Sequence, residues 1–179
     1  MILKHESKSR YTFAVVFVFL LSSLLFIESC KVSYSLSGVN LPPEIKTYSV
    51  AYFPNRAPVV QATLSQKFTD ALKDKITGQT NLDLVNGVGD VDFSGEIKNY
   101  RTSPTAITGD EVAALNRLTI TVRVKFTNNI NPDDSFDTSF SRYEDYPSDT
   151  NLADVEDDLI DQIVDQLVED IFNKAFVNW

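Results

Sequence analysis

Cysteine and histidine are the residues most often used as nucleophiles, general bases and metal ligands, and this chain of 179 residues has one of each. The histidine, His5, lies in an N-terminal segment that we expect to be removed. The remaining chain would have no histidine, which excludes Ser-His-Asp catalysis, Cys-His pairs and histidine-ligated zinc. Carboxylate-only chemistry, as in glycoside hydrolysis, stays open. Most acids lie on one expected solvent-exposed helix, however, so the sequence favours a protein that is not an enzyme and has no cofactor or metal.

The single cysteine, Cys30, ends a hydrophobic N-terminal segment. Basic residues come first, residues 11–27 follow with few polar side chains, and two further residues precede the cysteine. A basic region, an apolar region and an acceptor thiol in this order are typical of a bacterial lipoprotein. We therefore predict that residues 1–29 form a signal peptide, that Cys30 becomes the lipidated first residue, and that the polar residues 30–44 form a tether.

Two other interpretations of this segment stay open. One is a permanent transmembrane anchor, although the strictly apolar stretch of about 15 residues is shorter than the ~20 that a spanning helix needs. The other is an ordinary secretory signal, although the expected A-x-A-like cleavage site is missing and Ser33-Tyr34-Ser35 is a poor substitute. Glu28 is unusual for a lipoprotein signal, because the position two before the acceptor cysteine is usually small or apolar.

The charge balance excludes one class of partner. The whole chain carries a net charge of -9. The expected signal peptide holds three basic and two acidic residues, so residues 30–179 would carry -10. Nucleic-acid binding requires a basic surface and is therefore excluded. The same charge argues against general adhesion to anionic lipid.

Alternating apolar residues predict several strands after the tether. The clearest covers residues 117–127, where apolar side chains face one way and polar ones the other without interruption. Gly95 is expected to form a bulge in another strand, and residues 102–114 are expected to be a loop. The further strands are expected at residues 45–53, around 82–85, at 91–97 and from Phe136 onward, the last forming a hairpin with the clearest one.

Apolar residues spaced three or four apart predict two helices. The first begins at a capping box of Thr63 and Gln66 and ends with Gly78 in a left-handed conformation. The second covers residues 152–176. Helices and strands that each have one apolar face pack in two layers. We therefore predict a single α+β domain at residues 45–179, a two-layer sandwich with a mixed, mostly antiparallel sheet of about four strands and both helices on one face.

Cys30 and four later segments carry a resemblance to a known family. The segments are residues 48–58 (YSVAYFPNRAP), 115–128 (LNRLTITVRVKFTN), 140–143 (FSRY) and 167–175 (LVEDIFNKA). Together they resemble the Bacteroidota branch of the LptE family of lipopolysaccharide-assembly lipoproteins. The resemblance implies a protein anchored in the periplasmic leaflet of the outer membrane, which plugs the lumen of the LptD β-barrel, assists its assembly and helps deliver lipopolysaccharide to the cell surface. It also implies that the protein is not an enzyme.

The polar face of the expected strand at residues 117–127 offers a candidate binding site. Arg117, Arg123 and Lys125 form a local basic stripe there in an otherwise acidic chain. Arginine forks suit phosphate, and the lipopolysaccharide implied by the resemblance is phosphorylated. We therefore expect these residues to contact lipopolysaccharide or the barrel wall. The alternative is that they pair with acids on the neighbouring strand, such as Asp137.

A second function also stays open, namely a periplasmic or surface lipoprotein that binds a glycan or peptide without catalysis. By analogy with Bacteroidota surface lipoproteins, acids directly after the acceptor cysteine would mark export to the cell surface. Residues 31–35 contain none, which favours the periplasmic side and the LptD partnership. Tyr143, Tyr146 and Trp179 are candidate interface aromatics, and packing explains them equally well.

Overall fold

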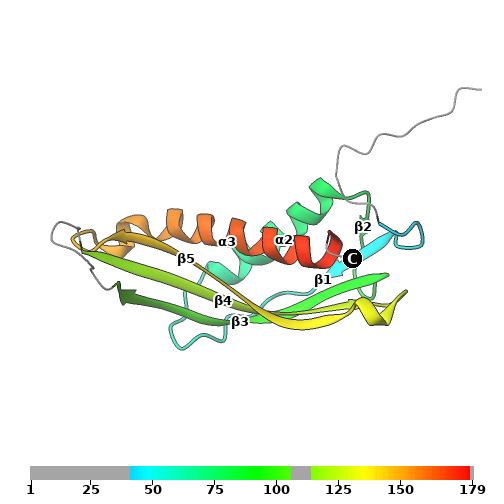
Figure 1. The fold of residues 1–179 in the computed structure, drawn as a ribbon, viewed down its shortest axis with the longest axis horizontal. Coiled ribbons are helices and arrows are strands. Elements are labelled where there is room, and N and C mark those ends of the chain that lie inside the picture. Colours follow the sequence, from blue (N-terminus) through cyan, green and yellow to red (C-terminus); the bar gives the residue numbers. More distant parts are fainter. Residues whose placement is uncertain (1–40, 106–113, 178–179) are drawn as a thin grey trace, which may run out of the picture. The chain divides into compact units, whose positions relative to one another are not determined.

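The computed structural model describes residues 41–105 and 114–177 (Figure 1). The expected signal peptide, Cys30 and most of the tether lie outside the described residues. None of the helices within these two ranges is long and apolar enough to cross a membrane. In chain order the elements are β1 (Thr47–Val50), α2 (Leu64–Gln79), β2 (Asp83–Leu84), β3 (Val91–Pro104), β4 (Leu115–Asn128), the 3-10 helix η1 (Pro132–Asp134), β5 (Phe136–Pro147) and α3 (Leu152–Phe176).

The strands form one five-stranded sheet in the order β2-β1-β3-β4-β5. β1 runs parallel to β2 and β3, whereas β3, β4 and β5 are successively antiparallel. Both helices lie on the same side of the sheet (Figure 1). The predicted α+β fold with two layers is therefore confirmed, and the fifth strand is the short edge strand β2.

β4 follows the predicted alternation. The apolar residues that the alternation singled out are buried, namely Leu118, Ile120, Val122, Val124 and Phe126. The residues between them point to the other face of the sheet, because successive side chains of a strand alternate. β4 pairs with β3 on one side and with β5 on the other along nearly its whole length. The predicted hairpin between β4 and β5 is thus confirmed.

A group of aromatic rings joins the end of β4 to the C-terminal part of α3. The ring of Phe126 lies 5.0 Å from that of Phe93 on β3 and 5.2 Å from that of Phe136 on β5. The ring of Phe176 lies 6.1 Å from that of Phe126 and 5.2 Å from that of Phe172. Aromatic side chains bury large apolar areas, so this group holds α3 firmly on the sheet.

The ends of α2 differ from the prediction. Gln61 caps the first turn in place of the predicted capping box, because its Oε1 accepts hydrogen bonds from the backbone amides of Thr63 and Leu64. Thr63 makes no side-chain capping bond. The helix continues through Gly78, which does not have a positive φ, and ends at Thr80 in an extended conformation.

β3 is longer than predicted. It continues to Pro104, because it pairs with β4 well into the expected loop. The irregularity in this ladder falls between Ile97 and Asn99, so the predicted bulge at Gly95 is wrong. Gly95 stays in register with Val124 and has a φ of 158°.

β1 is shorter than predicted and ends at Val50. After Val50 the Ala51 amide still donates to the carbonyl oxygen of Phe93, and the chain then leaves the ladder and returns to β3 at Asn55, opposite Ile97. Phe53 is fully buried there, whereas Tyr52 is exposed. The alternation read from the sequence therefore holds only for the first part of this segment.

Asp90 ties the start of β1 to the turn before β3. Its Oδ2 accepts hydrogen bonds of 2.9 Å from the backbone amides of Lys46 and Thr47 and from the Thr47 hydroxyl. These hydrogen bonds, led by that from the Lys46 amide, hold the pKa of the Asp90 carboxyl below its ordinary value. The charged form of Asp90 thus favours the folded state.

We expect the Asp90→Asn variant to be less stable at neutral pH and less sensitive to acid than the wild type. A carboxyl with a lowered pKa in the folded state stabilises the fold above its unfolded pKa of about 4, and the contribution is lost as pH falls through the folded pKa. The loss is the difference in the free energy of unfolding between neutral pH and a pH below about 3, each measured by urea unfolding. The loss should shrink in the variant and persist in the control Asp74→Asn, an exposed acid of α2. An equal loss in wild type and Asp90→Asn would contradict the assignment.

Candidate functional site

The face of the sheet opposite the helices is polar, and neither α2 nor α3 covers it (Figure 1). We term it the open face. It is built from alternate residues of three strands that lie in register across the sheet. These residues are Asp92, Ser94, Glu96, Asn99, Arg101 and Ser103 of β3, Arg117, Thr119, Thr121, Arg123, Lys125 and Thr127 of β4, and Asp137, Ser139, Ser141, Tyr143 and Asp145 of β5.

Arg117 forms a two-pronged ion pair with its neighbour on β5. Its Nε and Nη2 donate hydrogen bonds to Oδ1 and Oδ2 of Asp145 at 2.7 and 2.8 Å. The guanidinium also lies 3.5 Å from the centre of the Tyr143 ring, a cation–π contact. The hydrogen bonds to Arg117 lower the pKa of the Asp145 carboxyl.

Arg123 makes the same type of pair with Asp137, which lies one step diagonally across the β4–β5 ladder. Nε and Nη2 donate to Oδ1 and Oδ2 at 2.7 and 2.6 Å. Lys125 lies directly opposite Asp137 in the register. Within residues 41–105 and 114–177, Lys125 forms no ion pair. A shallow depression of about 300 Å³ lies beside these side chains.

The structure therefore brings all three predicted residues together on one face. It also shows that both arginines make the cross-strand pairs that the sequence offered as the alternative to ligand contact. Each pair uses Nε and Nη2, so Nη1 of each arginine makes no side-chain hydrogen bond to the described part of the chain. A guanidinium has five N–H donors, and a paired arginine on an open surface can therefore hold a further acceptor.

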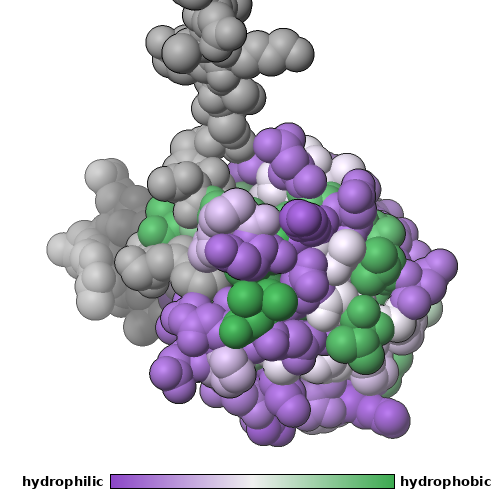
Figure 2. Space-filling model, turned by 90° about the vertical axis from the view of Figure 1, so that its right-hand side faces the viewer, coloured by the Kyte–Doolittle hydropathy of each residue, from purple (hydrophilic) through white to green (hydrophobic). Residues whose placement is uncertain are grey.

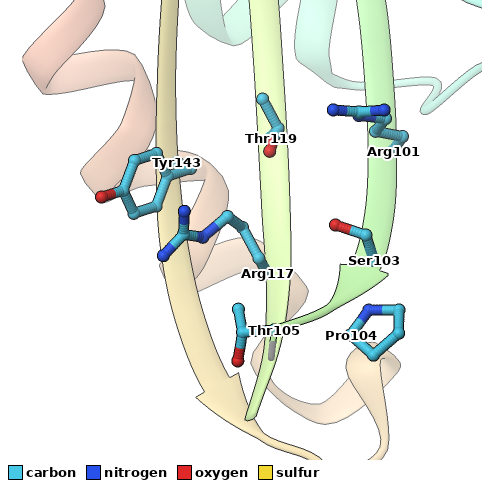
Figure 3. Close-up of a pocket in the computed structure, with 7 residues that line it drawn as sticks. All are labelled: Arg101, Ser103, Pro104, Thr105, Arg117, Thr119 and Tyr143. Carbon is cyan, nitrogen blue, oxygen red and sulfur yellow. The ribbon is translucent and has the colours of Figure 1, made fainter. Parts of the chain in front are cut away.

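A larger depression of about 520 Å³ lies at one end of the open face (Figure 3). Arg101 extends from β3 toward Thr119, while Arg117 extends toward Tyr143 (Figure 3). Arg101 has no ion-pair partner among the residues that the structure describes. The lining residues are Arg101, Ser103, Pro104, Thr105, Arg117, Thr119 and Tyr143.

Sequence reasoning missed Arg101 and Ser103. The strand was expected to end at residue 97, so Arg101 fell just before the expected loop at residues 102–114 and Ser103 fell within it. In the structure Arg101 is opposite Thr119 and Ser103 is opposite Arg117. The alternation of polar residues after residue 98 was the available signal, and only the pairing with β4 shows which face they share.

The open face suits binding better than catalysis. It offers guanidinium, ammonium and hydroxyl groups in shallow depressions, a combination that recognises phosphate and sugar groups. No group of three or more histidine, cysteine, aspartate or glutamate side chains in the described ranges could hold a metal ion. Fold and site together define a small α+β module with one open polar sheet face.

The comparison with protein families identifies which kind of module this is. The LptE family, described as lipopolysaccharide-assembly, matches residues 45–175, which is more than half of the chain. The protein belongs to the LptE family of lipopolysaccharide-assembly lipoproteins. The family is non-catalytic, which confirms the prediction that the protein is not an enzyme.

Solved structures are similar to this chain in fold at low sequence identity. A hypothetical protein from Chlamydia trachomatis is 11% identical with a TM-score of 0.53, and the match covers 75% of this chain and 98% of that chain. A minor lipoprotein from Acinetobacter baumannii is 14% identical with a TM-score of 0.49, covering 73% and 92%. Rare lipoprotein B from Shewanella oneidensis is 13% identical with a TM-score of 0.46, covering 70% and 91%. No curated protein matches the sequence.

Proposed function

We propose that this protein seats in the lumen of an LptD-type β-barrel, assists its assembly and helps deliver lipopolysaccharide to the cell surface. A lipid on Cys30 anchors the protein to the periplasmic leaflet of the outer membrane. The protein comes from a member of the Bacteroidota. The observation that carries this proposal is the family match over residues 45–175. The resemblance of the segment ending at Cys30 to a lipoprotein signal supports the anchor.

The polar character of the open face supports a position of the domain inside the barrel lumen. The lumen-facing side chains of an outer-membrane barrel are polar, whereas the lipid-facing ones are apolar. A sheet face of hydroxyl and charged groups can therefore lie against such a wall without burying unpaired apolar surface. The ion pairs of Arg117 and Arg123 keep the charges of these arginines paired both in water and against the barrel wall.

We propose further that the basic residues of the open face contact the phosphate groups of lipopolysaccharide. Arg117, Arg123 and Lys125 were the residues expected from the sequence, and Arg101 joins them from β3. Unlike Arg117 and Arg123, Arg101 and Lys125 make no ion pair in residues 41–105 and 114–177. Charge-assisted hydrogen bonds from such groups are among the stronger contacts to phosphate.

Reversing the charge of Arg101 tests this contact. We expect Arg101→Glu to weaken binding of purified lipopolysaccharide by roughly 10- to 150-fold, because a charge-assisted hydrogen bond contributes about 1.5–3 kcal/mol. Thermal unfolding should change little, since the side chain is exposed and unpaired within the described ranges. Binding is measured by titration with fluorescently labelled lipopolysaccharide.

The matched control is Lys73→Glu, which makes the same change of charge on α2, on the other side of the sheet. It should leave lipopolysaccharide binding unchanged. Equal losses in the two variants would indicate a general effect of net charge and would contradict a site on the open face.

A further inference from the structure

Three apolar side chains stand exposed at one end of the sheet. Val88 is 83% exposed, Leu84 49% and Ile130 47%. Val88 lies in the turn between β2 and β3, and Ile130 lies in the turn after β4. Turn positions usually carry small or polar residues, and side chains this exposed add little to the core.

Hydrogen bonds hold these turns together at the same end. The amide of Asn129 donates to the carbonyl oxygen of Asp90 at 2.9 Å, and its side-chain Nδ2 donates to that of Gly89 at 2.8 Å. Leu84 on β2 is paired with Tyr48 near the start of β1. Figure 2 views the molecule from this side and shows apolar patches among hydrophilic side chains.

The described chain also begins at this end. The amide of Ile45 donates to the carbonyl oxygen of Pro42, and the next residue, Lys46, is bound to Asp90 through its amide. Eleven residue-to-residue steps lead from Cys30 to Leu41, and at no more than about 3.6 Å each they span at most roughly 40 Å. A lipid on Cys30 would therefore hold this end of the domain within roughly 40 Å of the membrane surface, nearer than the far end of the long strands.

We propose that Leu84, Val88 and Ile130 form a second membrane contact, inserting at the boundary between headgroups and acyl chains of the bilayer that holds the anchor. This inference rests on the proposed lipidation of Cys30. The anchor raises the local concentration of bilayer around this end, so a contact too weak to bind alone becomes populated. The three side chains then leave water for an apolar medium.

Charge at this end selects the kind of lipid. Asp83, Asp133 and Asp134 lie on the same turns and strand end, against Lys46 at the start of the domain. Anionic headgroups would be repelled by these carboxylates. The surface therefore fits a zwitterionic bilayer, such as one of phosphatidylcholine or phosphatidylethanolamine.

The test uses single cysteines in the full lipidated chain. With Cys30 acylated, the natural chain has no other thiol, so Val88→Cys and Ile130→Cys can each be labelled at one place with an environment-sensitive fluorophore. The control is Ser148→Cys at the opposite end of the sheet, where the amide of Ser148 is bound to the carbonyl oxygen of Ala114. The proteins are reconstituted into phosphatidylcholine vesicles with and without nitroxide-labelled acyl chains.

The labels at positions 88 and 130 should lose about half of their emission to the nitroxide lipids, because side chains at the boundary lie roughly 5–10 Å deep. The label at position 148 should lose almost none. If the protein binds the vesicles but its labels at 88 and 130 are quenched no more than the label at 148, the proposed membrane contact is wrong. The lipid anchor on Cys30 would still stand. Protein that fails to float with the vesicles would overturn the anchor and this inference with it.

Discussion

The Gly95→Ala variant is expected to lower the free energy of unfolding by about 2–4 kcal/mol, the combined cost of a strained backbone and an overpacked contact. Gly95 has a φ of 158°, outside the range that L-residues readily adopt. A methyl group there would overlap the carbonyl oxygen of Arg123 and lie 2.7 Å from Cε1 of Phe53. The Arg123 oxygen belongs to the backbone of β4, so it can move only by disturbing the ladder with β3.

Gly78→Ala is the matched control for this prediction. Gly78 lies within α2 without a positive φ, and a methyl group there would meet nothing within 4 Å. Alanine favours a helix over glycine, so this variant should be more stable than the wild type by about 0.4–1 kcal/mol. The same chemical change is therefore expected to act in opposite directions at the two positions. Urea unfolding that gave both variants the same sign would show that Gly95 is not under the steric constraint described.

The Cys30→Ser variant is expected to lose its lipid and nearly all of its firm attachment to the outer membrane. Serine offers no thiol, so the thioether to the lipid cannot form, and several acyl chains are removed from the protein at once. Mass spectrometry of the purified protein measures the modification, and membrane fractionation measures the attachment. The fold should be unaffected, because no described element contains residue 30.

Ser33→Ala is the control, since it changes a nearby tether residue and keeps the acceptor thiol. It should stay lipidated and membrane-bound. If Cys30→Ser remained in the membrane as firmly as the wild type, a permanent transmembrane anchor would explain the segment better. An unmodified Cys30 thiol in the native membrane fraction would contradict the lipoprotein assignment directly.

The strongly periodic elements could be predicted from the sequence. The alternation in β4 and the apolar stripe of α3 each come from many residues that agree, and both elements have the expected bounds within a few residues. The two-layer arrangement follows from them, because each element has one apolar side to bury. The placement of Arg117, Arg123 and Lys125 on one face follows from the same alternation.

The details that depend on pairing could not be predicted in this way. The partner of Arg117, Asp145, is set by the β4–β5 register, and Arg101 joins the open face only because β3 extends beside β4. The cap of α2 depends on Gln61, which precedes the helix and lies outside the residue pattern expected of a cap. A glycine within a strand pattern predicts a bulge, whereas Gly95 is required because the Phe53 ring and the backbone of β4 leave no room for a side chain.

Purification of the lipidated protein from solubilised outer membranes tests the central claim most directly. If it acts as the plug of an LptD-type translocon, a large β-barrel protein should copurify with it in a stable one-to-one ratio. The same domain should then be protected from protease added to intact cells. A lone lipoprotein that is cleaved by protease on intact cells, with no barrel partner, would contradict the proposal and favour a surface lipoprotein that binds a glycan or peptide.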